Sequence, residues 1–198
     1  MHYVSIADTR WESETALTAA AATGDQDACR DLVALLQPRI RNLCVFLAGR
    51  RHDPDDLAQN VLMEILQSAG SFRGESSLAR WADRIAVHTG ARVVEKRQRR
   101  DRLWERHGRE LNEGDARSPD ELTDRKVKVR LALLLSTLPD ERRTAMVLHH
   151  VQGYSIAEVA QMTDALPNTV RDRLQVGRSE LRALILNDPV LREWRAGR

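Results

Sequence analysis

The sequence is poor in aromatic residues and has no long apolar run. Only 4% of its 198 residues are Phe, Trp or Tyr, so the chain holds few of the residues that favour β-strands. Ala, Leu, Arg, Asp and Glu are abundant, and most of these residues favour helix because unbranched side chains lose little rotamer freedom there. No apolar run approaches the roughly 20 residues that a membrane span needs. We therefore expect an all-α protein that does not insert into a membrane.

Cysteine is also scarce. Cys29 and Cys44 lie in apolar stripes and form no Cys-x-x-Cys motif. We interpret them as small core residues of a protein in a reducing compartment, and we expect neither a disulfide nor a metal site from them. The segment from Met1 to Trp11 lacks the basic and apolar parts of a secretion signal, which predicts a cytoplasmic location.

The sequence shows no pattern typical of an enzyme. It has no glycine-rich phosphate loop, no nucleophile paired with a base and no paired-carboxylate pocket. The pair His149-His150 suggests a metal site, but adjacent helical residues point about 100° apart. No cysteine or acidic cluster shares a face with them. We therefore expect no catalytic residue, no metal and no cofactor.

The N-terminal half shows helical periodicity of apolar residues. This pattern predicts helices over about 15–23, 25–47, 54–69 and 78–100, with a polar loop at 70–77. The clearest start signal is Asp53-Pro54-Asp55-Asp56, which combines an Asp N-cap, a Pro at the first helical position and acids in the first turn. Pro38 lies inside the second helix and should kink it or mark its weak point.

The C-terminal half begins after a segment without apolar periodicity. Residues 102–117 are therefore predicted to be a flexible linker between two small helical domains, 12–101 and 118–188. Helices are predicted over about 118–137, 140–151, 156–162 and 167–186. Ser155 and Glu158 have the spacing of a capping box at the start of the third of these helices.

The last two predicted helices have the pattern of a helix-turn-helix. A short helix, a tight turn at 163–166 and a longer basic helix form the arrangement that places a recognition helix in the major groove. The alternative interpretation is an ordinary antiparallel helix pair with a solvated charged face. The net charge of +2 does not decide between them, but basic and acidic stretches are segregated along the chain, and the pattern favours DNA binding.

The sequence resembles a known family, the bacterial sigma factors. In the C-terminal half the resemblance to sigma region 4 rests on Leu138-Pro139-Asp140-Glu141-Arg142-Arg143, Gly153-Tyr154-Ser155-Ile156-Ala157-Glu158-Val159-Ala160 and Thr169-Val170-Arg171-Asp172-Arg173-Leu174. In the N-terminal half, the resemblance to region 2 rests on Asp53-Pro54-Asp55-Asp56-Leu57-Ala58-Gln59-Asn60-Val61 and on Phe72-Arg73-Gly74-Glu75-Ser76-Ser77-Leu78. The order of the two modules and the short linker are similar to those of the extracytoplasmic-function class.

The sequence departs from the family pattern in two segments of the C-terminal motif. In the first segment, Pro167 lies one position later than the Pro that is common in the family. Asn168 stands where the turn before the recognition helix commonly ends in Gly, and we expect the turn to survive because Asn tolerates a left-handed backbone. Val176-Gly177-Arg178 replaces a commonly more basic segment, which removes one positive charge. This second departure concerns which phosphate or base the helix touches there.

The resemblance implies three binding surfaces. The residues implied to read the minus-thirty-five element are Asn168, Thr169, Arg171, Asp172, Arg173, Gln175 and Arg178. The residues implied to contact the minus-ten element are Arg73, Ser76, Ser77, Arg80, Arg84, His88 and Arg92. In the family, a base of this element is extruded beside the loop that corresponds to 71–77. The residues implied to bind core polymerase are Asp53, Asp56, Gln59, Asn60 and Glu64. Trp81 falls on the apolar stripe of its helix, so we expect it in the core rather than as a stacking platform.

The resemblance therefore implies an alternative sigma factor. Its expected partners are core RNA polymerase, through the β′ clamp and the β flap, promoter DNA and an anti-sigma factor. Two alternatives stay open: a stand-alone regulator that binds DNA as a dimer, and a sigma-like adaptor that binds proteins and has lost promoter reading. Asp172 and Val176 are the only residues that favour the adaptor.

Overall fold

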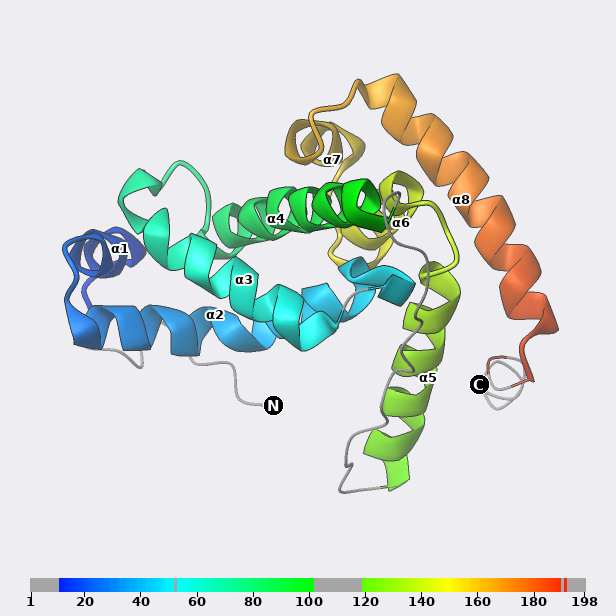
Figure 1. Ribbon diagram of the computed structural model, residues 1–198, viewed down its shortest axis with the longest axis horizontal. Helices are drawn as coiled ribbons and strands as arrows, with labels where there is room; N and C mark the ends of the chain where they lie inside the picture. The colour runs from blue at the N-terminus through cyan, green and yellow to red at the C-terminus, as the bar shows by residue number, and fades with distance from the viewer. Residues whose placement is uncertain (1–10, 52, 102–118, 190, 192–198) are drawn as a thin grey trace. The chain divides into compact units, whose positions relative to one another are not determined.

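A computed structural model of the chain describes residues 11–51, 53–101, 119–189 and 191 (Figure 1). Within these ranges the chain forms helices joined by turns and loops, with no strand, which confirms the predicted all-α fold. The chain divides into two compact units. The first holds the described residues of Met1–Val45 and Pro54–Arg102, and the second holds those of Phe46–Asp53 and Leu103–Arg198. The predicted linker, 102–117, lies outside the described residues, so the domain bounds stay a prediction.

The first unit is built from four helices and a 3-10 turn: α1 (Glu14–Ala22), α2 (Gln26–Leu47), α3 (Pro54–Gln67), η3 (Ala69–Ser71) and α4 (Leu78–Asp101). As the sequence indicates, Asp25 caps α2, because its Oδ1 accepts hydrogen bonds from the backbone N–H groups of Asp27 and Ala28 at 2.9 Å each. The helix α2 continues through Pro38. The fully buried large side chains of the core are Leu17, Leu32, Ile40, Leu43, Val61, Ile65 and Leu78.

A buried ion pair crosses this core. The Arg39 guanidinium of α2 donates to both carboxylate oxygens of Asp83 in α4, from Nε at 2.8 Å and from Nη2 at 2.6 Å. The Asp83 side chain is fully buried, and that of Arg39 is 25% exposed. A bidentate pair of this kind satisfies a carboxylate that would otherwise be buried without a partner.

The second unit contains the predicted helix-turn-helix. Its elements are η2 (Gly49–Arg51), α5 (Pro119–Leu135), α6 (Asp140–Met146), a π-helical turn (Val147–Val151), α7 (Ile156–Met162) and α8 (Pro167–Asn187), and α8 packs against α5, α6 and α7. The predicted capping box is present, since Ser155 Oγ accepts from the Glu158 N–H at 3.3 Å and Glu158 Oε2 accepts from the Ser155 N–H at 2.7 Å.

The chain is helical over 140–151, as predicted, with an α-helix to Met146 and a π-helical turn after it that periodicity of apolar residues cannot distinguish from an α-turn. One local prediction in this unit is wrong. The left-handed residue of the helix-turn-helix is Asp164, with φ 48°, while Asn168 lies inside α8. Asp, like Asn, adopts this backbone because its short polar side chain bonds locally.

Arg143 is the most buried basic residue of the second unit, with 3% of its side chain exposed. Its guanidinium donates to the carbonyl oxygens of Leu138 at 3.2 Å and Leu47 at 3.1 Å, and to Asp140 Oδ1 at 2.5 Å. Gly49 has φ 66°, and a Cβ at this position would lie 3.0 Å from the same guanidinium. The Leu138–Arg143 segment quoted above therefore has a structural role that the sequence did not reveal.

Candidate nucleic-acid and polymerase interfaces

One face of α8 is buried and the opposite face is exposed. Val170, Leu174 and Gly177 are buried. At Gly177 the helix comes so close to α6 that an added Cβ would lie 3.0 Å from Met146 Cγ. The predicted reading residues Arg171, Asp172, Gln175 and Arg178 are all on the exposed side. All four of these side chains are therefore accessible from solvent.

A hydrogen bond in the first turn of α8 restrains the side chain of Arg171. Arg171 Nη1 donates to Asn168 Oδ1 at 2.5 Å, and both residues are exposed. This bond restrains a side chain that would otherwise lose rotamer freedom on binding. Thr169, between them, is half-buried.

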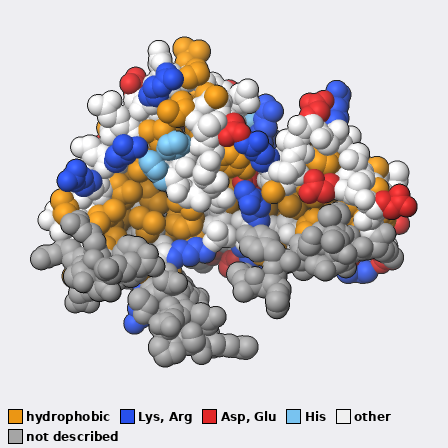
Figure 2. Space-filling model, turned by 180° about the vertical axis from the view of Figure 1, so that it is seen from behind, with side chains coloured by type: hydrophobic (Ala, Val, Ile, Leu, Met, Phe, Trp, Pro, Cys, Tyr) orange, Lys and Arg blue, Asp and Glu red, His pale blue; other side chains and the backbone are white. Residues whose placement is uncertain are grey.

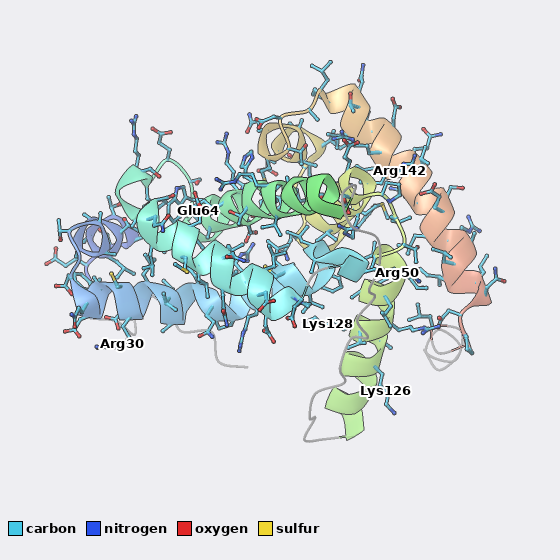
Figure 3. All side chains as sticks on the ribbon, in the orientation of Figure 1. Arg30, Arg50, Glu64, Lys126, Lys128 and Arg142 are labelled. Atoms are coloured by element: carbon cyan, nitrogen blue, oxygen red, sulfur yellow. The ribbon has the colours of Figure 1, made fainter. Side chains whose placement is uncertain are left out.

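Arg173 differs from the other predicted DNA-binding residues of α8. Its side chain is only 20% exposed, and its Nη2 lies 3.0 Å from Glu141 Oε2 in α6. A second ion pair joins the same two helices, because Arg142 Nη1 lies 2.6 Å from Glu180 Oε1 (Figure 3). The pair with Glu141 and the low exposure hold Arg173 against α6, so the structure favours a packing role for this residue.

The exposed face of the helix-turn-helix also carries apolar side chains. Leu166, in the turn before α8, is 74% exposed, and Val176 of α8 is 42% exposed. The prediction from the sequence does not name Leu166 and Val176 as exposed apolar positions here. The helical register that placed Asp172 at the surface also predicts exposure for Val176, four residues further on.

The two adjacent histidines lie in the π-helical turn. Their rings are 4.7 Å apart in an edge-to-face arrangement, and His149 Nδ1 lies 2.7 Å from the Tyr154 carbonyl oxygen, so Nδ1 carries the proton. Partial burial lowers the pKa of His150, and the neighbouring His149 and Arg178 lower it further. Among the described residues, no group of three or more His, Cys, Asp or Glu is placed to hold a metal ion.

The predicted minus-ten surface lies on the loop before α4 and on α4 itself. Arg73, Ser76, Ser77, Arg80, Arg84 and Arg92 are exposed, and His88 is half-buried. Trp81 is half-buried rather than fully in the core, with its ring edge-on to buried Phe72 at 5.5 Å between centroids. Ser77 also has a local role, because its Oγ accepts from the Arg80 N–H at 3.4 Å in the first turn of α4.

The predicted polymerase-binding residues lie on or next to α3. Asp56, Gln59 and Asn60 are exposed on this helix, and Asp53, also exposed, belongs to the second unit. Glu64 is not free, since its Oε1 lies 3.2 Å from Arg92 Nη2 on α4 (Figure 3). The ion pair joins a residue predicted to bind polymerase to one predicted to bind DNA, which the one-dimensional pattern could not show.

Met63 is the exposed apolar residue of α3, with 60% of its surface accessible. It lies three and four residues from Asn60 and Gln59 and therefore beside them on the helix surface. The residues predicted from the sequence for the polymerase-binding surface are all polar, and Met63 is not among them. An exposed Met surrounded by polar side chains is typical of an adaptable binding surface.

Charge on the surface is mixed. Figure 2 shows Lys and Arg side chains spread over one face of the molecule among acidic and apolar ones. This distribution fits a formal net charge of +2, which produces no strong general positive field. In the part of the chain that the structure describes, no helix is long and apolar enough to span a bilayer.

Comparison with known proteins matches both halves of the chain to family models. Residues 32–100 match the family model for sigma-70 region 2, and residues 128–181 match that for sigma-70 region 4. The chain is 28% identical to the RNA polymerase sigma-H factor of Pseudomonas aeruginosa over 190 residues, 92% of this chain and 97% of that one. It is 29% identical to the extracytoplasmic-function sigma factor SigM of Mycobacterium tuberculosis over 177 residues, 87% of this chain and 85% of that one.

A solved structure shares the fold. The sigma factor RpoE of Bartonella quintana, solved in complex with the anti-sigma factor NepR, superimposes with a TM-score of 0.62 and 23% identity over 80% of this chain and 97% of that one. The region 2 match covers the helices that carry the predicted minus-ten and polymerase surfaces, and the region 4 match covers the helix-turn-helix. The chain therefore belongs to the sigma-70 family and is a sigma factor of the extracytoplasmic-function class.

Proposed function

We propose that this chain is an alternative sigma factor whose three exposed surfaces have separate roles. The face of α8 with Arg171, Asp172, Gln175 and Arg178 reads the minus-thirty-five element. The loop before α4, with the arginines of α4, binds and opens the minus-ten element. The exposed face of α3 binds core RNA polymerase, which supplies all the catalysis, so the chain itself is not an enzyme and acts in the cytoplasm.

The observation that carries this proposal is the division of α8 into two faces. Val170, Leu174 and Gly177 attach one face to the rest of the helix-turn-helix, and the other presents donors, an acceptor and an amide. Arg pairs with guanine, Gln with adenine, and Asp accepts from the cytosine amino group, so this face can read bases directly.

Two solved structures with a similar fold were determined as complexes, one of them with an anti-sigma factor, and they support a further partner. RpoE is bound to NepR in one structure and CnrH to the cytosolic domain of CnrY in another. We infer that this chain is also held by an anti-sigma factor when it is inactive. The β flap of core polymerase is the proposed partner of the second unit.

Run-off transcription tests the function directly. Core polymerase with the full chain should initiate on a DNA fragment from upstream of the gene for this chain, and core polymerase alone should not. A stand-alone dimeric regulator would bind the fragment but would not bind core polymerase in a pull-down. A protein-binding adaptor would bind core or another protein and give no promoter-dependent transcript. Either result would contradict the proposed function.

A further inference from the structure

The loop between η3 and α4 is fixed to α1 and α4 at three points. Phe72, at its start, is buried against Trp81. Gly74 has φ 72°, and a Cβ there would lie 3.3 Å from Thr15 Oγ1 of α1. At its end, the Leu78 backbone N–H donates to Glu14 Oε2 at 2.9 Å. The backbone of the loop is therefore anchored, while the side chains at 73 and 75–77 are exposed.

Glu14 makes the hydrogen-bonded anchor at the end of the loop. Leu78 is the first residue of α4, and the first N–H groups of a helix have no partner within it. A carboxylate accepts such a bond more strongly than a neutral group does. Glu14 is also the first residue of α1, directly after the cap Ser13, whose side chain accepts from the Ala16 N–H at 3.1 Å. One half-buried carboxylate thus lies at two helix N-termini, where negative charge is favourable.

We propose that Glu14 is a positioning residue for the minus-ten loop, which holds the start of α4 and so presents Arg73, Ser76 and Ser77 in a conformation ready to bind an unpaired base. This inference rests on the proposed function of the loop. Without the carboxylate, the first turn of α4 loses the partner of its leading N–H, and the loop must be ordered when DNA binds. Ordering a loop on binding lowers affinity, while preorganisation raises it.

The proposal and simple electrostatics predict opposite effects of removing the Glu14 carboxylate. DNA is negatively charged, so removal of a carboxylate beside it should by itself strengthen binding. Loss of positioning should instead weaken promoter opening. Glu14→Gln separates the two effects, because the amide oxygen still accepts from the Leu78 N–H although the charge is gone. Glu12→Ala is the matched control, because Glu12 is an exposed acid two residues away.

The experiment uses full-length variants with core polymerase and the promoter fragment that supports run-off transcription with the unaltered chain. Permanganate reactivity of thymines in the minus-ten element measures opening, and a duplex limited to the minus-thirty-five element measures binding by α8. We expect Glu14→Ala to reduce opening about tenfold, with binding of the minus-thirty-five duplex and of core within about twofold. Glu14→Gln should recover most of the loss, and Glu12→Ala should show none.

Three outcomes would overturn the inference: normal opening by Glu14→Ala, an equal defect in Glu14→Gln, or the same defect in Glu12→Ala. If Glu14→Ala does not fold, Gly74→Ala tests the positioning of the loop instead, because a Cβ at φ 72° strains the loop backbone beside Thr15, and this variant should also reduce opening while duplex binding is kept. Normal opening by a folded Gly74→Ala variant would then contradict the inference. Failure of the unaltered chain to open any promoter would instead overturn the proposed function, and this inference with it.

Discussion

At the scale of single residues, α8 separates side chains that can read bases from those that only bind the DNA backbone. Arg171 and Gln175 are exposed near the start and middle of the helix, and Arg178 is exposed further along. Arg171 is already restrained by Asn168. Base contacts carry sequence information, and phosphate contacts carry none.

Replacement of Gln175 or Arg171 by Ala should therefore cost about 1–3 kcal/mol of binding free energy only on fragments with the preferred base. Arg178→Ala should weaken binding on all fragments alike and reduce the dependence on salt. Titrations on matched and base-substituted minus-thirty-five fragments at two salt concentrations measure both effects. Equal losses on every fragment for Arg171→Ala and Gln175→Ala would show that α8 binds only the backbone.

Cys44 is the second residue for which the structure gives a sharp expectation. Burial, together with the smaller effects of the nearby Asp83 and Asp55 carboxylates, raises the pKa of its thiol to about 12. The thiolate is the reactive form, so at pH 8 Cys44 should resist a thiol reagent until the protein unfolds, while half-buried Cys29 should react first. Because the ordinary pKa is 9.0, Cys44 ionises in the unfolded chain first, and its contribution to stability is lost as pH rises from about 9 to 12.

Timed labelling with and without urea, followed by mass spectrometry of the peptides, measures this expectation. Cys44→Ser gives the control, because only one labelled peptide should then appear. Rapid labelling of Cys44 in the folded protein would contradict the burial of this thiol.

At the scale of elements, α3 carries the surface on which the polymerase prediction rests. Replacement of Gln59 by Ala together with Met63 by Ser should weaken binding to core polymerase about tenfold, since a few central contacts carry most of the energy of an interface. Affinity chromatography or anisotropy with labelled chain measures it, and circular dichroism checks that the helix content is kept.

Gln67→Ala is the matched control, because Gln67 is exposed at the last residue of α3. Glu64→Gln is a separate variant that removes the pair with Arg92 and should affect DNA binding as well as core binding. Unchanged core affinity in a well-folded Gln59→Ala, Met63→Ser protein would contradict the docking surface.

The helix caps and ion pairs show which parts of the structure could be predicted from the sequence alone. The caps at Asp25 and Ser155 and the bounds of α7 could be predicted because these signals are local, with donor and acceptor within a few residues. The pairs Arg92–Glu64 and Arg173–Glu141 could not, because they depend on which helices pack together. Glu14 was missed for the same reason, since its partner Leu78 lies 64 residues away.

At the scale of the whole molecule, the domain organisation is still a prediction from sequence. Residues 102–117 have no apolar periodicity, and a segment of this kind is a preferred site of proteolysis. Limited proteolysis of the free chain should therefore cut first between Arg102 and Arg117 and release two folded pieces. Mass spectrometry locates the first cut, and resistance of this segment with early cutting elsewhere would contradict the boundary.

The buried pair Arg39–Asp83 has a consequence for how this sequence changes in evolution. Removal of either partner alone breaks the bidentate pair in the core, which typically costs about 3–5 kcal/mol, a large part of the stability of a small domain. A well-packed apolar pair can be neutral, but it is reached only through one of these destabilised single variants. The two positions are therefore strongly epistatic, and each preserves the identity of the other.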